Sequence, residues 1–311
     1  MQTQGVYTSL PELIGLQWAA RGFNLLPRQP LRSVLAGRHG ARIRGRGLNF
    51  EELRAYLPGD DVRSIDWKVT ARTRKPHTRV YTDERERRVL LVVDQRLAMF
   101  FGTRVQLKSV TAAELAALVA WQVLSVGDRV GAVVFDDSRT VEIEPHRTRV
   151  SVLRVLEALV EHNRALGMGR GLIGDPARIN AVLEGVARRA THDWLIFVAS
   201  DFHGADADTQ RIVKRLARHN DVVAALVHDA AAGTLPVMDR AVVSDGRLQI
   251  ELDLAAARTR ARIHAFMEER MRQVRRLETE LAVPVLPIDT GGDVAGQLRL
   301  ALGFRPAARR R

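Results

Sequence analysis

The most informative pattern in the chain is a set of short apolar runs separated by amphipathic stretches. The run Val89–Val93 has no polar alternation and ends at Asp94. A strand buried on both faces has this pattern, which is typical of the centre of a parallel sheet. We therefore predict a central strand here, with Asp94 at its carboxyl end, where open α/β sheets bind ligands.

The same two patterns alternate along the following part of the chain. Apolar runs predict strands, and apolar residues at helical spacing predict helices. Their alternation predicts an α/β fold with a parallel sheet wound by right-handed crossovers and an edge strand over residues 140–144. The predicted strands cover residues 130–135, 194–198, 222–228 and 283–288, and the predicted helices cover residues 110–125, 150–160 and 208–218.

Local start signals predict further helices. Ser9 and Glu12 form a capping box, so a helix is expected from there to about Arg21. Asp175 followed by a proline predicts another helix start. A long helix is expected over residues 255–281, and its apolar side either covers the sheet, which we favour, or forms a coiled-coil seam.

Two small β elements are expected outside the parallel core. Ile65–Val69 and Thr78–Thr82 alternate like strands, and Asp245-Gly246 lies between two β-like runs as in a type I′ hairpin. The first element also contains the acids Asp60, Asp61 and Asp66. We expect these acids to cap backbone amides rather than to catalyse a reaction.

These elements divide the chain into four parts. They are a helix and linker (residues 1–36), a basic β element (37–86), an α/β domain (87–305) with a hairpin insertion near 237–254, and a basic tail (306–311). The net charge of +12 is uneven, because residues 28–88 hold 16 Lys and Arg against 8 Asp and Glu. A basic block of this kind binds nucleic acid, anionic lipid or an acidic protein surface.

Composition excludes several classes of protein. The chain has no cysteine, and its nine histidines are scattered singly, which argues against disulfides and against a metal site. No phosphate loop, nucleophile elbow or dinucleotide fingerprint is present, so we expect no cofactor. The amino terminus lacks a signal-peptide pattern and no apolar run is long enough to span a bilayer, so we expect a cytoplasmic protein without a transmembrane segment.

Motifs flanking the first strand carry a family resemblance. They read Gly45-Arg-Gly-Leu48, Pro58-Gly-Asp-Asp-Val-Arg63, Ile65-Asp-Trp67, Thr70-Ala-Arg72 and Asp83-Glu-Arg-Glu86. Over roughly residues 37–303 the chain resembles the bacterial domain-of-unknown-function family numbered fifty-eight, whose members usually occur beside MoxR-type AAA+ ATPases. The strand ending in Asp94 resembles that of von Willebrand factor type A-like domains. The resemblance implies a Rossmann-like parallel sheet flanked by helices.

The resemblance also implies a place for a metal-ion-dependent adhesion site, in which an Asp, two Ser, a Thr and a second Asp hold magnesium. Here these positions correspond to Asp94, Arg96, Ala98, Ala177 and Asp201. Three of the five oxygen-bearing side chains are lost, so we expect a degenerate site without a metal. Arg96 either replaces the ion by pairing with the acids or points outward into solvent.

By resemblance, we expect a non-enzymatic adaptor that works with a MoxR-type AAA+ ATPase on an unknown client protein. One alternative is a nucleic-acid-associated protein that uses the basic block, in which Arg42, Arg44 and Arg46 form a possible partner surface. For these residues we expect weak, non-specific nucleic-acid binding at most. The other alternative is a hydrolase that uses the carboxylates of Asp94 and Asp201.

Overall fold

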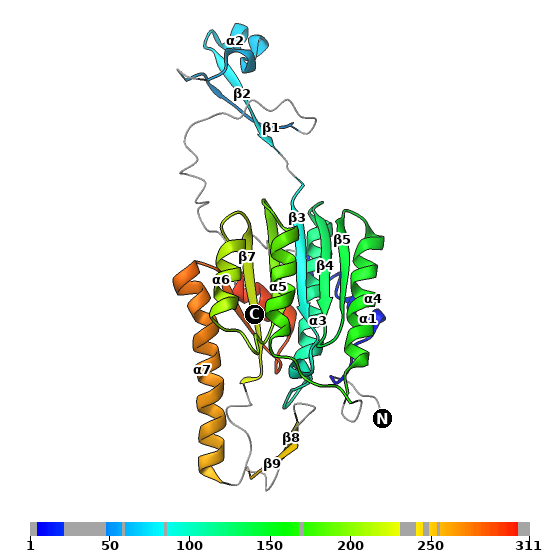
Figure 1. Ribbon diagram of the computed structural model, residues 1–311. Coiled ribbons are helices and arrows are strands. Elements are labelled where there is room, and N and C mark those ends of the chain that lie inside the picture. The colour runs from blue at the N-terminus through cyan, green and yellow to red at the C-terminus, as the bar shows by residue number, and fades with distance from the viewer. Residues whose placement is uncertain are drawn as a thin grey trace, which may run out of the picture. The chain divides into compact units, whose positions relative to one another are not determined.

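The protein consists of two units (Figure 1). One is formed by Met1–Arg28 together with Arg87–Arg311, and the other by Gln29–Glu86. The computed structural model describes residues 5–21, 48–57, 60–83, 86–167, 171–230, 241–244, 249–253 and 256–303. Each unit is described by itself below.

The larger unit is built on a six-stranded sheet with the order β10-β7-β6-β3-β4-β5. Its strands are β3 (Arg88–Asp94), β4 (Arg129–Phe135), β5 (Thr140–His146), β6 (Trp194–Ser200), β7 (Asp221–His228) and β10 (Val285–Asp289). All neighbours are parallel except β4 and β5, which pair antiparallel at one edge. The predicted Rossmann-like α/β fold, its central first strand and its edge strand are confirmed.

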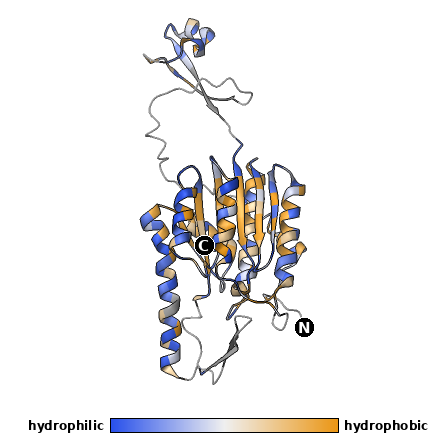
Figure 2. Cartoon of the chain, in the orientation of Figure 1, coloured by the Kyte–Doolittle hydropathy of each residue, from blue (hydrophilic) through white to orange (hydrophobic). Residues whose placement is uncertain are grey.

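The central strand β3 explains why its sequence is apolar throughout. Val89–Val93 are at most 1% exposed, because β3 lies between β4 and β6 and is covered on both faces. Val89, Leu91 and Val93 belong to the core on one face, and Leu90 and Val92 to the core on the other. Figure 2 shows the resulting hydrophobic strands at the centre of this unit.

Helices cover both faces of the sheet. The first core includes residues of α1 (Leu10–Gly15), α3 (Lys108–Ser125), α4 (Arg149–Ala165) and α8 (Val294–Ala301). The second includes residues of α5 (Arg178–Arg189), α6 (Ala207–Leu216) and α7 (Ala257–Leu281). Because α3 touches the sheet, α1, α4 and α8, it is buried almost all round, as its Ala, Leu and Val content predicts.

The long helix α7 covers the sheet, as favoured, with Val274 and Leu277 buried in the second core. Strands β8 (Ala241–Ser244) and β9 (Gln249–Leu252) form a separate antiparallel pair. The predicted Asp245-Gly246 turn between them lies outside the described residues. Among the residues that the structure describes, no helix combines the length and apolar character needed to cross a membrane.

The smaller unit contains the antiparallel pair β1 (Leu48–Ala55) and β2 (His77–Asp83), so the predicted strand Thr78–Thr82 is confirmed. The strand predicted over Ile65–Val69 is wrong. After the 3-10 turn η2 (Val62–Ser64), this stretch enters the helix α2 (Trp67–Thr73). The Asp66 carboxylate accepts hydrogen bonds from the N–H groups of Lys68 and Val69, and this capping outweighs the alternation of apolar residues.

Two predicted helix boundaries also shift. The helix α1 ends at Gly15, and residues 16–21 form turns rather than a helix reaching Arg21. The helix α5 begins at Arg178, because Asp175 and Pro176 are held in a preceding turn. The residues that hold this turn in place stand at the carboxyl edge of the sheet.

Candidate functional site

Each of the five parallel strands ends at or immediately before an aspartate. These residues are Asp94, Asp136, Asp201, Asp229 and Asp289. Because the strands are parallel, their carboxyl ends meet at one edge of the sheet, the edge at which α/β folds bind ligands. Asp94 and Asp201 follow the two central neighbours β3 and β6, and they are 0% and 2% exposed.

Arg96 is paired with Asp94 by a two-pronged ion pair. Its Nη2 donates to Asp94 Oδ2 over 2.8 Å, and its Nε donates to Asp94 Oδ1 over 3.0 Å. The backbone N–H of Arg96 also donates to Asp94 Oδ1 over 3.0 Å. A charge-assisted pair of this geometry fixes both side chains as well as stabilising them.

The other end of the Arg96 guanidinium holds the loop before α5. Its Nη1 donates to the carbonyls of Asp175 and Pro176, both over 3.2 Å. Arg96 is 1% exposed, so it lies inside the protein and does not point into solvent. Burial by itself lowers the pKa of Arg96, but the Asp94 carboxylate outweighs it and raises this pKa, so the guanidinium remains charged.

Ser200 adds a third contact to Asp94. Its hydroxyl donates to Asp94 Oδ2 over 2.6 Å and accepts from the N–H of Phe202 over 2.9 Å. A hydroxyl at the end of β6 therefore links the acid of β3 to the loop after β6. Asp94 thus accepts hydrogen bonds from both Arg96 and Ser200.

Asp201 is paired with a different cation. Lys108, the first residue of α3, lies 2.5 Å from Asp201 Oδ2, and Arg270 of α7 lies 3.6 Å from the same oxygen. Burial alone raises the pKa of Asp201, but Lys108 and Arg270 outweigh it and hold this pKa well below the usual range. Arg270 also contacts Nδ1 of His203, whose pKa is lowered by burial and by the nearby guanidinium.

Asp137, just after β4, ties two loops together. It accepts hydrogen bonds from the N–H of Leu97 over 2.6 Å and from the N–H of Asp175 over 2.7 Å. Burial raises its pKa, and these two hydrogen bonds act in the opposite direction. The loop after β3 and the turn before α5 are therefore fixed by one carboxylate as well as by Arg96.

Gly204 closes the site from the β6 side. It has a φ of +82°, and a Cβ atom there would lie 2.1 Å from the carbonyl oxygen of Pro176. Phe202, two residues earlier, also has a positive φ of 54°, which is uncommon for a large side chain. The loop after β6 thus approaches the turn before α5 as closely as the backbone allows.

The structure brings four of the predicted site positions to one edge of the sheet. Asp94, Arg96 and Asp201 are buried there, and Ala98 is half-buried in η3 (Leu97–Met99). Ala177 is exposed and follows Pro176, whose carbonyl contacts Arg96. Arg42, Arg44 and Arg46 lie outside the described residues.

Sequence reasoning missed four residues that complete this arrangement: Lys108, Asp137, Ser200 and Arg270. Asp137 and Ser200 could have been found in the same way as Asp94, from their positions at strand ends. Asp137 follows the parallel strand β4, and Ser200 is the last residue of β6. Lys108 and Arg270 could not be found in this way, because their helices are distant in sequence and only packing brings them to Asp201. Arg96 was expected to reach either acid, but it bonds Asp94 and leaves Asp201 to these two cations.

The acids of the edge are occupied by protein groups. Thr103 donates to Asp229 through its N–H and its hydroxyl, and the N–H of Ala230 donates to Asp289. Within the described ranges, His, Asp and Glu side chains form no group of three or more arranged to hold a metal ion. We call the loops after β3, β4 and β6, together with the turn before α5, the rim. Its acids are balanced by protein groups and its loops are held in place, so it does not present a set of free oxygen ligands.

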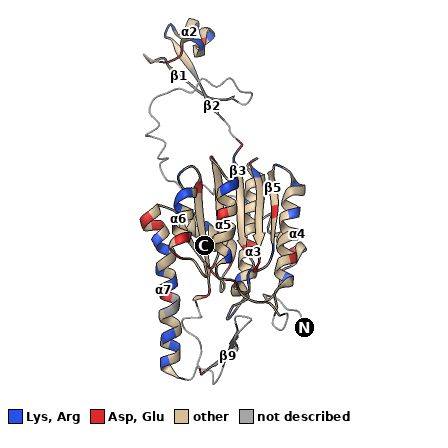
Figure 3. Cartoon of the chain, viewed as in Figure 1, with Lys and Arg blue, Asp and Glu red and all other residues tan. Residues whose placement is uncertain are grey.

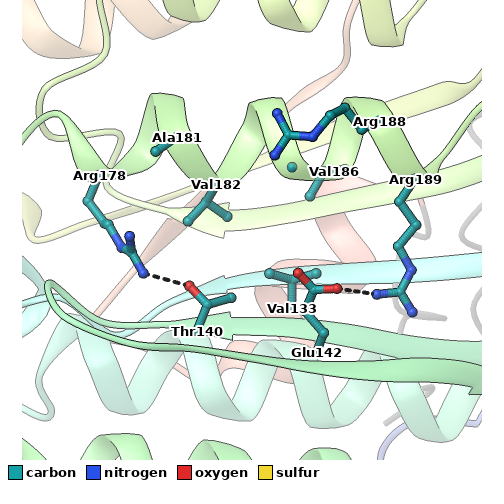
Figure 4. A pocket seen from close by; sticks show the side chains of 10 residues that line it. Val133, Thr140, Glu142, Arg178, Ala181, Val182, Val186, Arg188 and Arg189 are labelled. Carbon is teal, nitrogen blue, oxygen red and sulfur yellow. Dashed lines mark hydrogen bonds and ion pairs between the residues drawn. The ribbon is translucent and has the colours of Figure 1, made fainter.

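A groove lies between α5 and the strands β4 and β5 (Figure 4). Arg178 donates to Thr140 over 2.9 Å, and Arg189 donates to Glu142 over 2.6 Å, so both arginines tie the helix to the edge strand. Val133, Val182 and Val186 form its apolar floor. Arg178 and Arg189 hold α5 against β5, and we assign no catalytic or binding role to the groove.

Comparison with known proteins places the chain in a family. The model of the family described as "Protein of unknown function DUF58" matches residues 52–275. Uncharacterized proteins of Mycobacterium bovis (Mb1516) and Mycobacterium tuberculosis (Rv1480) are each 31% identical over 227 residues, which cover 73% of this chain and 69% of each relative. The chain therefore belongs to the DUF58 family of proteins of unknown function.

Proposed function

We propose that the protein is a non-enzymatic adaptor with a von Willebrand A-like domain, working with a MoxR-type AAA+ ATPase in the maturation or remodelling of a client protein. The observation that carries this proposal is the buried pair of Asp94 and Arg96. A protein cation holds the first acid of the degenerate adhesion site, in the slot where the resemblance expects a metal-binding serine. The site then acts as a preformed binding rim without metal chemistry.

The surroundings of the two acids support a binding role over hydrolysis. The pKa of Asp201 lies well below its usual range because Lys108 and Arg270 surround it. A carboxylate held ionised in this way has no proton to donate near neutral pH. Asp94 is likewise engaged by Arg96 and Ser200, so neither acid is free to activate water or to attack a substrate.

The form of the rim supports recognition of another protein. Arg96, Asp137 and Gly204 hold the loops after β3, β4 and β6 against the turn before α5. A surface fixed before binding loses little conformational entropy on association. The choice of a MoxR-type ATPase as partner rests on the family resemblance.

Binding of the purified chain to the MoxR-type ATPase of the same bacterium tests the partnership. Biolayer interferometry with ADP and with a slowly hydrolysed ATP analogue should detect a complex. Ala177→Arg places a bulky charge on the exposed rim and should weaken the complex by about tenfold or more, or roughly 1.4 kcal/mol. Ala181→Arg, one turn further along α5 and also exposed, is the control and should leave affinity within about twofold.

Failure to detect a complex in either nucleotide state would contradict the partnership, and equal effects of the two variants would contradict the rim. Calorimetry tests the cation separately. Titration with magnesium or manganese should give no binding heat, because Arg96 and Lys108 already balance the two acids. Micromolar affinity for either ion would contradict this part of the proposal.

A further inference from the structure

The smaller unit exposes one face of α2 that its own packing leaves uncovered. Trp67, Lys68, Ala71 and Arg72 are all exposed. Residues four apart are neighbours on the surface of a helix, so Trp67 lies beside Ala71 and Lys68 lies beside Arg72. We call these four residues the α2 face.

Trp67 gives this face a large apolar side chain. Trp67 is 68% exposed, and Leu57 and Val62, which precede it in the same unit, are 58% and 59% exposed. Single exposed apolar residues are ordinary on a protein surface, but an exposed tryptophan on the same short helix as exposed cations has the composition of a protein-binding surface.

The acidic and basic side chains around α2, in residues 60–75, differ in their contacts. The acids serve the fold: Asp60 forms an ion pair with Arg54 over 2.8 Å, Asp61 accepts from the N–H of Arg63, and Asp66 caps α2. The cations do not. Among the described residues, no carboxylate forms an ion pair with Lys68, Arg72, Arg74 or Lys75, and all four are exposed. Figure 3 shows Lys and Arg positions in blue on the ribbon of α2.

The mixture of groups favours a protein over a nucleic acid. Tryptophan and arginine are the residues that contribute most at protein–protein interfaces. Proteins that bind single-stranded nucleic acid stack successive bases on several aromatic side chains along a basic groove, whereas Trp67 is the one exposed aromatic side chain described in this unit. An acidic segment with aliphatic side chains satisfies both the charges and the apolar surface.

We propose that the α2 face binds a short acidic segment of a partner protein, with carboxylates that pair with Lys68 and Arg72 and aliphatic side chains that cover Trp67. This surface is a second binding site, and the proposal does not depend on the partnership with an ATPase. Because the pairing is electrostatic and solvent-exposed at its rim, binding should weaken as salt concentration rises.

Fluorescence anisotropy with the full chain tests this proposal. The probe is a labelled peptide of alternating glutamate and leucine; a peptide of alternating lysine and leucine and a single-stranded oligothymidine are the comparisons. We expect the acidic peptide to bind with a Kd on the order of 10 μM, and the basic peptide not to bind. Trp67→Ala and Arg72→Glu should each weaken binding by about tenfold or more.

Matched variants in the other unit provide the controls. Trp18 is as exposed as Trp67, at 70%, and Arg154 is an exposed arginine on a helix. Trp18→Ala and Arg154→Glu should leave affinity unchanged within about twofold. If Trp67→Ala does not fold, the double variant Lys68→Glu and Arg72→Glu keeps Trp67 and still tests the charge pairing.

Three results would overturn the proposal. They are no binding of the acidic peptide, equal losses in the Trp18 and Trp67 variants, and an oligothymidine that binds more tightly than the peptide. The last result would assign the face to nucleic acid. Circular dichroism of every variant separates loss of binding from loss of structure.

Discussion

Arg96 at the carboxyl edge and Arg72 on the α2 face are placed in opposite environments. Arg96 is 1% exposed and is bonded to a carboxylate and two carbonyls, whereas Arg72 is exposed and has no ion pair within the described part of the chain. Removing a charge from water costs several kcal/mol, so a buried charge must be fully paired. An exposed charge has no such cost and remains available for a partner.

The contrast separates two uses of charge in one chain. At the carboxyl edge, Asp94 with Arg96 and Asp201 with Lys108 fix the loops and form a rigid rim. At α2 and the turn before it, Asp61 and Asp66 cap backbone amides, and Lys68 and Arg72 form no ion pair with a carboxylate of the described residues. Substitutions at the carboxyl edge are therefore expected to lower stability. Substitutions on the α2 face are expected to weaken binding.

The largest expected effect is that of Arg96→Ala. It leaves the Asp94 carboxylate buried without a cation, so we expect the free energy of unfolding to fall by about 3–5 kcal/mol. Arg96→Lys should lose less, because the charge remains although the two-pronged geometry is lost. Urea denaturation followed by the fluorescence of Trp121 and Trp194, which are both buried in this unit, measures the change. A loss below about 1 kcal/mol would contradict the structural role of the pair.

The next effect concerns the close approach of two loops. Gly204→Ala places a methyl group against the carbonyl of Pro176 and requires a left-handed backbone for alanine, so we expect a loss of about 1–3 kcal/mol. Gly171→Ala is a useful control, because it has a similar φ of +66° but open space around its Cβ position. Equal losses in the two variants would show that conformation alone, and not the contact with Pro176, limits position 204.

A smaller effect is expected in the acid dependence of stability. The pKa of Asp201 is lower in the folded chain than the roughly 3.9 of an unfolded aspartate, so its contribution is complete above that value and is lost as pH falls through the folded pKa. The Asp201→Asn variant should therefore be less stable than the unsubstituted protein at neutral pH. It should also lose less stability than that protein when the pH is lowered. Urea midpoints between about pH 6 and pH 3 measure this. Parallel curves for the two proteins would exclude Asp201 as a source of the acid dependence.

The smallest effect on stability is expected at Arg72. Arg72→Ala removes an exposed charge without an ion pair in the described structure, so the free energy of unfolding should change by less than about 0.5 kcal/mol. The acidic peptide should nevertheless bind more weakly to this variant. A large loss of stability would show that Arg72 supports the fold and would remove the contrast with Arg96.

The alternating apolar runs predicted the parallel sheet because burial on both faces of a strand leaves a direct trace in the sequence. Strands β3, β4, β6 and β7 were identified in this way, and so was the edge position of β5. The same reasoning failed at Ile65–Val69. Alternation over so few residues is weak evidence, and the carboxylate of Asp66 starts a helix there.

For the candidate site, the sequence by itself placed Asp94 and Asp201 at the carboxyl edge, because the end of a buried strand sets the position of the next residue. It also determined that Arg96 is close enough to pair with Asp94. Only the tertiary structure decided that Lys108 and Arg270 neutralise Asp201, since these residues come from two helices whose packing no local pattern encodes. The local sequence sets where a charged residue stands on its strand or helix. The groups that offset the cost of burying its charge are those that the folded chain brings near it.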